Sequence, residues 1–454
     1  MSEIQNLMND LRAGRINRRE FIGQSLAMGV SLSGIAMLLQ SCGGGGGSAA
    51  NPPIKWSTWG NAGEIQRFQE FTKKYNTDHK ANVTLIPVPS SVNYVQKILT
   101  ELNGGVAPDL FYAGDGDIIK FVQNKTIVEL TALLGSSKSH SKVDEYLPGL
   151  WGASKTKSGK IYGVPVDCNP LVLWYNKKVL QDAGVTDDPA TLASQGQWTR
   201  DKFEEIINKV HAKGKYGYVL DDWTLPVYSW ITPQGGTVYD EDGYGQFVAQ
   251  DDAKAVEAFQ WLAKGMQSKT LTFAGTLPKG TGADLAFISN QVAFVSAGRW
   301  YLPEFKVAKG LEYDIVPFPS STGKMEPAGV ALAYMVINNK TKYQDAAFEF
   351  LTNFVSKEGQ TFRLQGGGNA VPSIKGPDQL VLEGNLPAHA QTFLDARNAG
   401  YALFPAEMGT PGLSDDIKTT FQNIWLKNAD VKDTLGKISA MANPRIKDAQ
   451  SKVQ

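Results

Sequence analysis

Cysteine and histidine are scarce in this chain of 454 residues, which has two of the first and four of the second. The histidines, His79, His140, His211 and His389, are scattered along the sequence. No segment shows zinc-ligand spacing, a Walker loop or a His-Glu-x-x-His helix. We therefore expect no metal site and no cofactor.

The chain also lacks an excess of charge of either sign, with 45 Lys and Arg against 45 Asp and Glu. A protein that binds nucleic acid needs a basic surface, so no nucleic-acid partner is expected. Hydrophobic residues make up 42% of the chain, enough to build a packed interior. Because a single core rarely serves so long a chain, the length predicts two lobes.

Long apolar runs are missing except near the start, where Phe21 to Leu39 reads FIGQSLAMGVSLSGIAMLL after a basic segment. Arg18 and Arg19 before this run resemble the twin-arginine export motif, although the general export route stays open. Leu39-Gln40-Ser41-Cys42 resembles a bacterial lipobox. We predict an export signal over residues 1–42, a lipidated Cys42 and a flexible Gly-rich tether over 43–51. The alternative is an uncleaved membrane helix, since about 19 residues can span a bilayer.

With Cys42 lipidated, Cys168 is left without a disulfide partner. It stands between Asp167 and Asn169 in VPVDCNP. The sequence favours a small buried residue over a nucleophile, because no nearby histidine is evident.

Strand and helix patterns alternate through the rest of the chain. Strands are expected at 54–59, 82–89, 107–114, 161–176, 291–298, 312–319 and 331–338, and helices at 64–75, 95–102, from 117, 203–210 after Thr199 as N-cap, 256–266, 347–354 and 417–425. This alternation predicts mainly parallel sheets covered by helices, which bind ligands at the loops that follow the strands.

Five segments in order carry a resemblance to a known family: GKIYGVPVDCNPLVLWYNKKVLQDAGV, WTRDKFEEI, NQVAFVSAGRW, DIVPFPS and LAYMVINNKTKYQDAAFEFLTNFVSKEGQ. Together they resemble the extracellular solute-binding proteins of carbohydrate importers, the maltose-binding-protein-like family. The resemblance implies an α/β two-lobe periplasmic-binding-protein fold of type II, with a hinge between the lobes and the ligand in a cleft. It places the N-terminal lobe at 52–166 plus 328–366 and the C-terminal lobe at 167–327 plus 367–454.

The resemblance also implies partners and a location. A carbohydrate would be the ligand, and the permease subunits of an ABC importer would receive it. The protein would be a monomer held by its lipid at the outer face of the cytoplasmic membrane.

Sugars present apolar C–H faces and a rim of hydroxyls, so aromatic rings beside carboxylates and amides are typical of their sites. The expected ligand-binding residues lie in loops or at strand ends: Trp59, Asn61, Asp115, Asp117, Asp167, Asn169, Trp223, Trp230, Gly236, Trp300 and Gly329. Trp300 matches the family position that stacks on ligand, and either Asp115 or Asp117 could face the sugar. Trp56, Trp174, Trp261 and Trp425 are expected to pack in the interior.

The sequence leaves alternatives to a sugar-binding protein: another solute, a secreted enzyme, or a calcium site in one loop. The solute could be a polyamine, a phosphodiester or a peptide, although a phosphate would want more Arg or Lys in these loops. A secreted carbohydrate-active enzyme would need carboxylates facing each other across a sugar, whereas Asp115 and Asp117 share one short loop. Asp240 to Gly243 hints at a calcium loop but lacks the required spacing, which favours a plain turn.

Overall fold

The computed structural model describes residues 51–88, 93–147, 149–156 and 158–452, together with the isolated positions 20 and 24. The twin-arginine pair, the lipobox with Cys42 and residues 43–50 of the tether lie outside the described residues. Residues 53–454 form one compact unit of the chain. Within the described part, no helix combines the length and the apolar composition that a bilayer crossing needs.

The first sheet has the strand order β11-β10-β3-β1-β2, with β4 also paired to β10. Its strands are β1 (Pro53–Trp59), β2 (Asn82–Val88), β3 (Leu110–Gly114), β4 (Val164–Pro170), β10 (Ala328–Ile337) and β11 (Tyr401–Ala402). Strand β1 pairs in parallel with β2 and β3, whereas β10 is antiparallel to β3 and β4. The sheet is therefore mixed, because β10 returns late from the other lobe to complete it.

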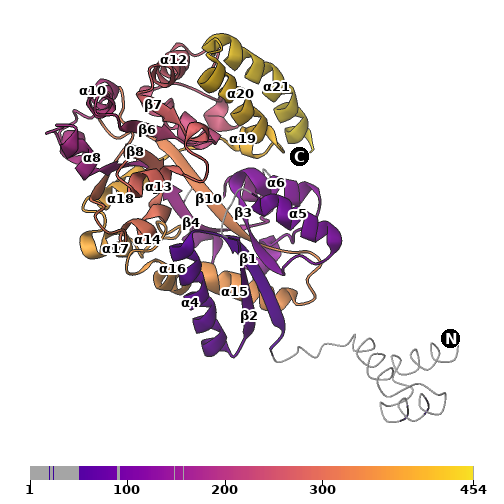
Figure 1. The fold of residues 1–454 in the computed structure, drawn as a ribbon. Coiled ribbons are helices and arrows are strands. Elements are labelled where there is room, and N and C mark those ends of the chain that lie inside the picture. Colours follow the sequence, from indigo (N-terminus) through magenta and orange to yellow (C-terminus); the bar gives the residue numbers. More distant parts are fainter. Residues whose placement is uncertain are drawn as a thin grey trace. The chain divides into compact units, whose positions relative to one another are not determined.

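The second sheet has the order β7-β6-β8-β5-β9. Its strands are β5 (Val172–Asn176), β6 (Tyr216–Leu220), β7 (Leu271–Phe273), β8 (Val292–Ala297) and β9 (Tyr313–Val316). Strand β6 is parallel to β7 and β8, and β5 is antiparallel to β8 and β9. The chain changes sheets between Pro170 and Val172 and returns at β10, the long strand that runs between the two lobes in Figure 1.

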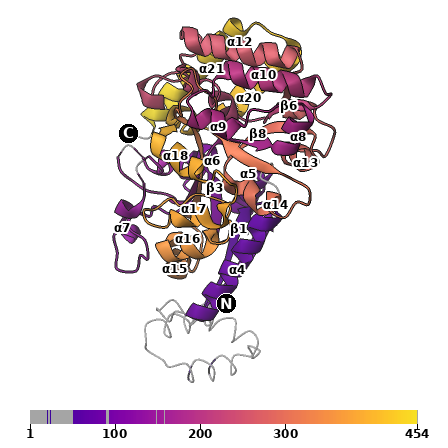
Figure 2. The ribbon, with the colours of Figure 1, turned by 90° about the vertical axis from the view of Figure 1, so that its left-hand side faces the viewer.

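Helices flank both sheets (Figures 1 and 2). They are α4 (Ala62–His79), α5 (Tyr94–Gly104), α6 (Asp115–Gln123), α7 (Thr131–Leu134), α8 (Lys177–Asp182), α9 (Pro189–Ser194), α10 (Arg200–His211), α11 (Thr224–Tyr228), α12 (Ala253–Gln267), α13 (Ala283–Ile288), α14 (Leu302–Phe305), α15 (Gln344–Val355), α16 (Lys357–Leu364), α17 (Gln379–Leu382), α18 (Gln391–Ala399), α19 (Pro405–Met408), α20 (Leu413–Lys427) and α21 (Val431–Ser451). This is the predicted two-lobe α/β architecture.

Two hydrophobic cores hold the lobes together. The first surrounds the first sheet and continues under one face of the second, and it contains the fully buried Trp56 and Trp174. The second core lies on the other face of the second sheet, against α10, α12, α20 and α21. Trp425 is buried as expected, while Trp261 is only partly buried against the second core.

Local sequence explains several element boundaries. The Thr199 side chain accepts a hydrogen bond from the Lys202 amide at the start of α10, which confirms the predicted N-cap. At α4, Asn61 and Glu64 form a capping box, in which each side chain accepts from the other residue's backbone amide. At the Asp240–Gly243 segment, the Asp240 carboxylate accepts from the Gln246 amide, as in a closed turn.

Candidate functional site

The strand ends of the two sheets meet along a boundary that we call the interlobe seam. On the side of the first sheet it contains Asn61, which follows β1. On the side of the second sheet it contains Trp300, in the short turn Arg299–Tyr301 that follows β8. The Asn61 Nδ2 donates to the Trp300 carbonyl over 2.9 Å. The loops after β1 and β8, predicted to bind ligand, are therefore neighbours.

Strand β4 supplies two further predicted residues to the seam. Asn169 Oδ1 accepts from the Arg299 backbone amide over 2.9 Å, and Asn169 Nδ2 lies 3.4 Å from Asp167 Oδ1. Both side chains are largely buried, with exposed fractions of 8% for Asn169 and 5% for Asp167. Gly298 completes this contact, because a Cβ there would lie 2.4 Å from the Trp300 ring. Asp167, Asn169 and Trp300 thus belong to one cluster.

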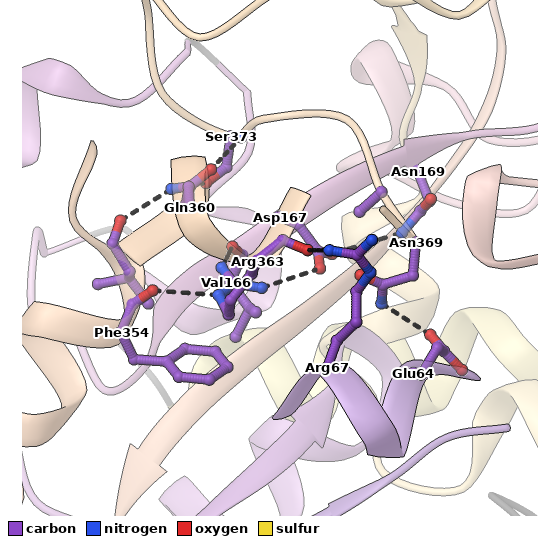
Figure 3. Close-up of polar contacts among 12 residues, drawn as sticks. Glu64, Arg67, Val166, Asp167, Asn169, Phe354, Gln360, Arg363, Asn369 and Ser373 are labelled. Carbon is purple, nitrogen blue, oxygen red and sulfur yellow. Dashed lines mark hydrogen bonds and ion pairs between the residues drawn. The ribbon is translucent and has the colours of Figure 1, made fainter. Parts of the chain in front are cut away.

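Two carboxyl groups at the seam hold protons unusually tightly. Burial raises the pKa of Glu64 to about 7, although hydrogen bonds from Asn369 and the Asn61 amide oppose the shift. Burial likewise raises the pKa of Asp167 to about 6, against the attraction of Arg363. Figure 3 shows the Asn369 amide directed at Glu64, with Nδ2 at 2.8 Å from Oε1. The seam therefore offers carboxyl and amide groups in a poorly hydrated setting.

Arg363 of α16 anchors this cluster from the interior. Its guanidinium donates to the carbonyls of Phe354 and Val166 and stacks 4.1 Å from the centre of the Phe354 ring (Figure 3). Its Nη1 lies 4.0 Å from Asp167 Oδ2. Among the described residues, Arg363 Nη1, Tyr112 Oη and Asn369 Oδ1 are buried without a hydrogen-bond partner in the protein. Buried polar atoms of this kind are costly unless something else satisfies them.

The four predicted tryptophans fall into two groups. Trp300 is half-buried and packs against both cores, and Trp59 is half-buried beside Tyr94 and Tyr112. Trp223 is also half-buried, before α11. Trp230 is only 1% exposed, so the structure places it in the second core rather than on a surface that a ligand could reach.

Asp115 and Asp117 lie in the first turn of α6, and both side chains are bonded to other residues of the protein. Asp115 Oδ1 accepts from the Ala153 amide at 2.9 Å and from the Tyr334 hydroxyl at 2.6 Å. Burial raises the pKa of Asp115 despite these bonds. Asp117 pairs with Lys120 at 2.9 Å. The structure does not bring either side chain into contact with the Asp167–Trp300 cluster.

The two predicted glycines serve close packing. A Cβ on Gly236 would lie 2.8 Å from the Ala255 Cα and from Ile231. A Cβ on Gly329 would lie 2.5 Å from Leu225, and the Gly329 amide donates to the Ser229 hydroxyl. Both positions therefore require glycine because neighbouring residues of the protein leave no space for a side chain.

Sequence reasoning missed several seam residues. Glu64 carries a recognisable signal, since Asn61-x-x-Glu64 is a capping-box pattern. Tyr112 and Asn369 give no such signal, because only the fold brings them near Asp167. Asp221 follows β6, and burial together with Asp284 and Asp222 raises its pKa to about 7. It also acts electrostatically on Tyr301, which stands next to Trp300.

Two surface recesses lie away from the seam. One runs between α4 and β2, lined by residues such as Lys73 and Asn76, and the other lies on α21 around Gly436. Both are wide open to solvent, unlike an enclosed ligand pocket with convergent groups. In the described part of the chain no group of three or more His, Cys, Asp or Glu side chains could hold a metal ion. Cys168 is fully buried, and burial raises its pKa to about 12, which fits an unreactive thiol.

Comparison with known proteins identifies the class. Residues 61–361 match the family model of the bacterial extracellular solute-binding proteins, and the chain belongs to this family. Its members bind solutes and are not enzymes, so the enzyme alternative does not hold. A maltooligosaccharide ABC transporter solute-binding lipoprotein of Streptococcus pneumoniae is 24% identical over 67% of this chain and 69% of its own.

Solved structures share the fold. The substrate-binding protein Lmo0181 of Listeria monocytogenes, in complex with cycloalternan, has a TM-score of 0.75 at 18% identity. The alignment covers 87% of this chain and 98% of that one. UgpB of Mycobacterium tuberculosis, in complex with glycerophosphocholine, has a TM-score of 0.73 at 18% identity over 89% and 100% of the two chains. The chain is thus similar to the two-lobe binding proteins of importers.

Proposed function

We propose that the protein is the lipid-anchored solute-binding component of an ABC importer and that it binds a sugar or oligosaccharide at the interlobe seam. The observation that carries the proposal is the position of Trp300. Its half-buried ring lies where the two cores meet, next to the Asp167–Asn169 pair. An aromatic face beside carboxyl and amide groups matches the two kinds of surface that a sugar presents.

The polar groups at the seam suit neutral hydroxyls. Burial raises the pKa values of Asp167, Glu64 and Asp221, so these carboxyl groups can both donate to and accept from sugar hydroxyls. Tyr112 and Asn369 add buried polar atoms without a protein partner. These groups form hydrogen bonds without requiring a charged ligand.

A phosphodiester fits less well. Both fully buried arginines near the seam donate mainly to backbone carbonyls, Arg299 to those of Ala370, Leu380 and Val381 and Arg363 to those of Val166 and Phe354. Only Arg299 Nε and Arg363 Nη1 are left without a hydrogen-bond partner among the described residues, and both are buried. The unpartnered Nη1 of Arg363 lies 4.0 Å from the Asp167 carboxylate, so a phosphate that approached it would meet a carboxyl group as well. The shared fold with UgpB carries no argument about this ligand.

Location and mechanism follow from the same proposal. Cys42 would carry the lipid at the outer face of the cytoplasmic membrane, and the related pneumococcal protein is itself described as a lipoprotein. Of the residues predicted for ligand contact, we propose that Trp59, Asp167, Asn169, Trp223 and Trp300 line the site. Asn61 lies beside it, with both polar atoms of its side chain engaged by Glu64 and Trp300. The lobes would close on the sugar by a hinge motion and present it to the permease subunits.

A thermal-shift screen of the purified protein tests the proposal. The panel contains maltotriose, other mono- and oligosaccharides, glycerophosphocholine, spermidine and a tripeptide. A ligand that binds the folded state at a hundredfold excess over Kd adds about 2.7 kcal/mol of stability. We expect a rise in the melting temperature with a carbohydrate only. A rise with glycerophosphocholine, spermidine or the tripeptide, and none with any sugar, would contradict the proposed ligand class.

A further inference from the structure

Asn61 has both polar atoms of its side chain engaged by protein, which distinguishes it from an ordinary ligand contact. Its Oδ1 accepts from the Glu64 amide at 2.9 Å and so caps α4. Its Nδ2 donates to the Trp300 carbonyl at 2.9 Å, across the seam. One amide therefore links the start of a helix in the first lobe to the backbone of the aromatic residue in the second.

Gly63, two residues further along α4, permits a close approach at the same place. A Cβ on Gly63 would lie 2.5 Å from the Cβ of Pro303, in α14 of the other lobe. Cβ atoms do not approach other carbons this closely, so any larger residue would push Pro303 away. Because Gly63 has no side chain, the Trp300–Pro303 segment can pack directly against α4.

Arg67 continues this contact face one turn later. Its Nη2 donates to the Gly366 carbonyl at 3.1 Å, and Nζ of Lys306, which follows α14, donates to the same carbonyl at 2.9 Å. Two side chains, one from each lobe, therefore donate to the same Gly366 carbonyl. Asn61 and Gly63 therefore contact the other lobe directly, whereas Arg67 donates to the carbonyls of Arg363 and Gly366 in its own lobe and meets the other lobe through Lys306.

We propose that Asn61 and Gly63 form a clasp that couples lobe closure to the position of Trp300. The clasp rests on the proposed function, since it makes these two residues positioning residues for the aromatic platform of the sugar site. When the lobes are together, the Asn61 amide and the bare Gly63 hold the Trp300–Pro303 segment against α4. When the lobes separate, the capping bond of Asn61 persists and only its bond to Trp300 is lost.

The substitution Asn61→Asp isolates the bond across the seam. Aspartate caps helices as well as asparagine does, so α4 keeps its N-cap. The donor Nδ2 becomes an acceptor oxygen facing the Trp300 carbonyl, and the two repel each other. Asn93→Asp is the matched control, because Asn93 precedes α5 in the same lobe and its side chain makes no capping bond.

The substitution Gly63→Ala tests the same clasp by shape. Alanine favours helix more than glycine does, so α4 itself should gain stability. The added methyl meets Pro303 only while the lobes are together. Gly436→Ala in α21 is the control, since a Cβ there has nothing within 4 Å.

Two measurements decide the matter. Spin labels at Thr77→Cys and Lys213→Cys, exposed positions in the two lobes, report the lobe separation by electron resonance. The labelled proteins carry Cys42→Ser, and the buried Cys168 does not compete for label. Calorimetric titration with maltotriose, or with the panel sugar that raised the melting temperature most, reports affinity. We expect Asn61→Asp and Gly63→Ala to shift the label distances towards separated lobes, both in the ligand-free population and at saturating sugar, where the lobes are closed. We also expect them to weaken binding about tenfold, with both controls unchanged.

Wild-type distances and wild-type affinity in both variants would overturn the clasp. Longer distances with unchanged affinity would overturn its coupling to Trp300. If the wild-type protein bound no sugar, the proposed function would fail, whereas the distances without sugar would still decide whether α4 holds the lobes together.

Discussion

The Arg363 guanidinium lies 4.0 Å from the Asp167 carboxylate, and both side chains are almost fully buried. Arg363 stabilises this arrangement by donating to the backbone carbonyls of Val166 and Phe354, which belong to separate segments of the chain. The pair thus ties α15 and α16 to β4, the strand that carries Asp167 and Asn169 into the seam.

Removing the arginine should cost far more stability than neutralising the acid. Arg363→Met leaves a buried carboxylate and two carbonyls without their partner, and we expect a loss of roughly 3–5 kcal/mol in the free energy of unfolding. Asp167→Asn removes a charge that burial already disfavours, so its cost should stay under about 1.5 kcal/mol. Urea denaturation measures both. Equal losses in the two variants would show that the pair does not work as described.

Stability should fall as the pH rises from about 4.5 to about 7. Burial raises the pKa of Glu64 and of Asp221 to about 7 and that of Asp167 to about 6. In this window the folded protein keeps protons that the unfolded chain has released, so raising the pH favours unfolding. Glu64→Gln should flatten the fall in melting temperature, whereas Glu70→Gln, on the exposed side of α4, should leave it unchanged. A slope that Glu64→Gln does not alter would argue against the buried state of that carboxyl group.

Cys42 should be the mature N-terminus and should carry a diacylglycerol. The basis is the order of the sequence signals, in which an Arg pair and an apolar run precede Leu39-Gln40-Ser41-Cys42. Intact mass spectrometry of the membrane-extracted protein gives the result directly, and Cys42→Ser should release the protein from the membrane fraction. A mature chain that begins elsewhere, or an unmodified Cys42, would refute the anchor.

Substituting Trp300 and Trp230 by alanine should have different effects, because we expect Trp300 to bind the sugar and Trp230 to pack in the core. Trp300→Ala removes a half-buried ring at the seam, so we expect a modest change in stability and at least about a tenfold loss of sugar affinity. Trp230 is 1% exposed beside Phe203 and Tyr218, so Trp230→Ala should cost roughly 3–5 kcal/mol of stability. Denaturation of the ligand-free variants measures the stability. A collapse of the Trp300→Ala variant would identify Trp300 as a packing residue.

Much of the fold could be predicted because each element carries its own periodicity. The strand expected at 82–89 and the Thr199 cap of α10 are local signals; the structure has a strand at Asn82–Val88 and confirms the cap. The environment of a tryptophan is not local. Trp230 follows a short helix and reads like a loop residue, yet α12 and Phe318 cover it from distant parts of the chain.

In the candidate site, too, local sequence predicts where residues lie along the chain but not which distant residues they contact. Asn61 and Trp300 were found because each follows a predicted strand, but nothing in the sequence says that one side chain bonds the backbone of the other. Asp115 looked like a ligand acceptor because it follows β3, whereas the Tyr334 hydroxyl and the Ala153 amide already occupy its Oδ1. Contacts between distant segments decide which polar groups remain available, and those contacts depend on the packed fold.

The central claim is that this protein binds a carbohydrate at Trp300. Calorimetric titration of the wild-type protein and of Trp300→Ala, with the sugar that most raises the melting temperature, tests it most directly. We predict saturable binding with one site per chain in the wild type and at least a tenfold weaker Kd in a variant that remains folded. Equal affinity in the two folded proteins, or no heat of binding with any sugar of the panel, would contradict the claim.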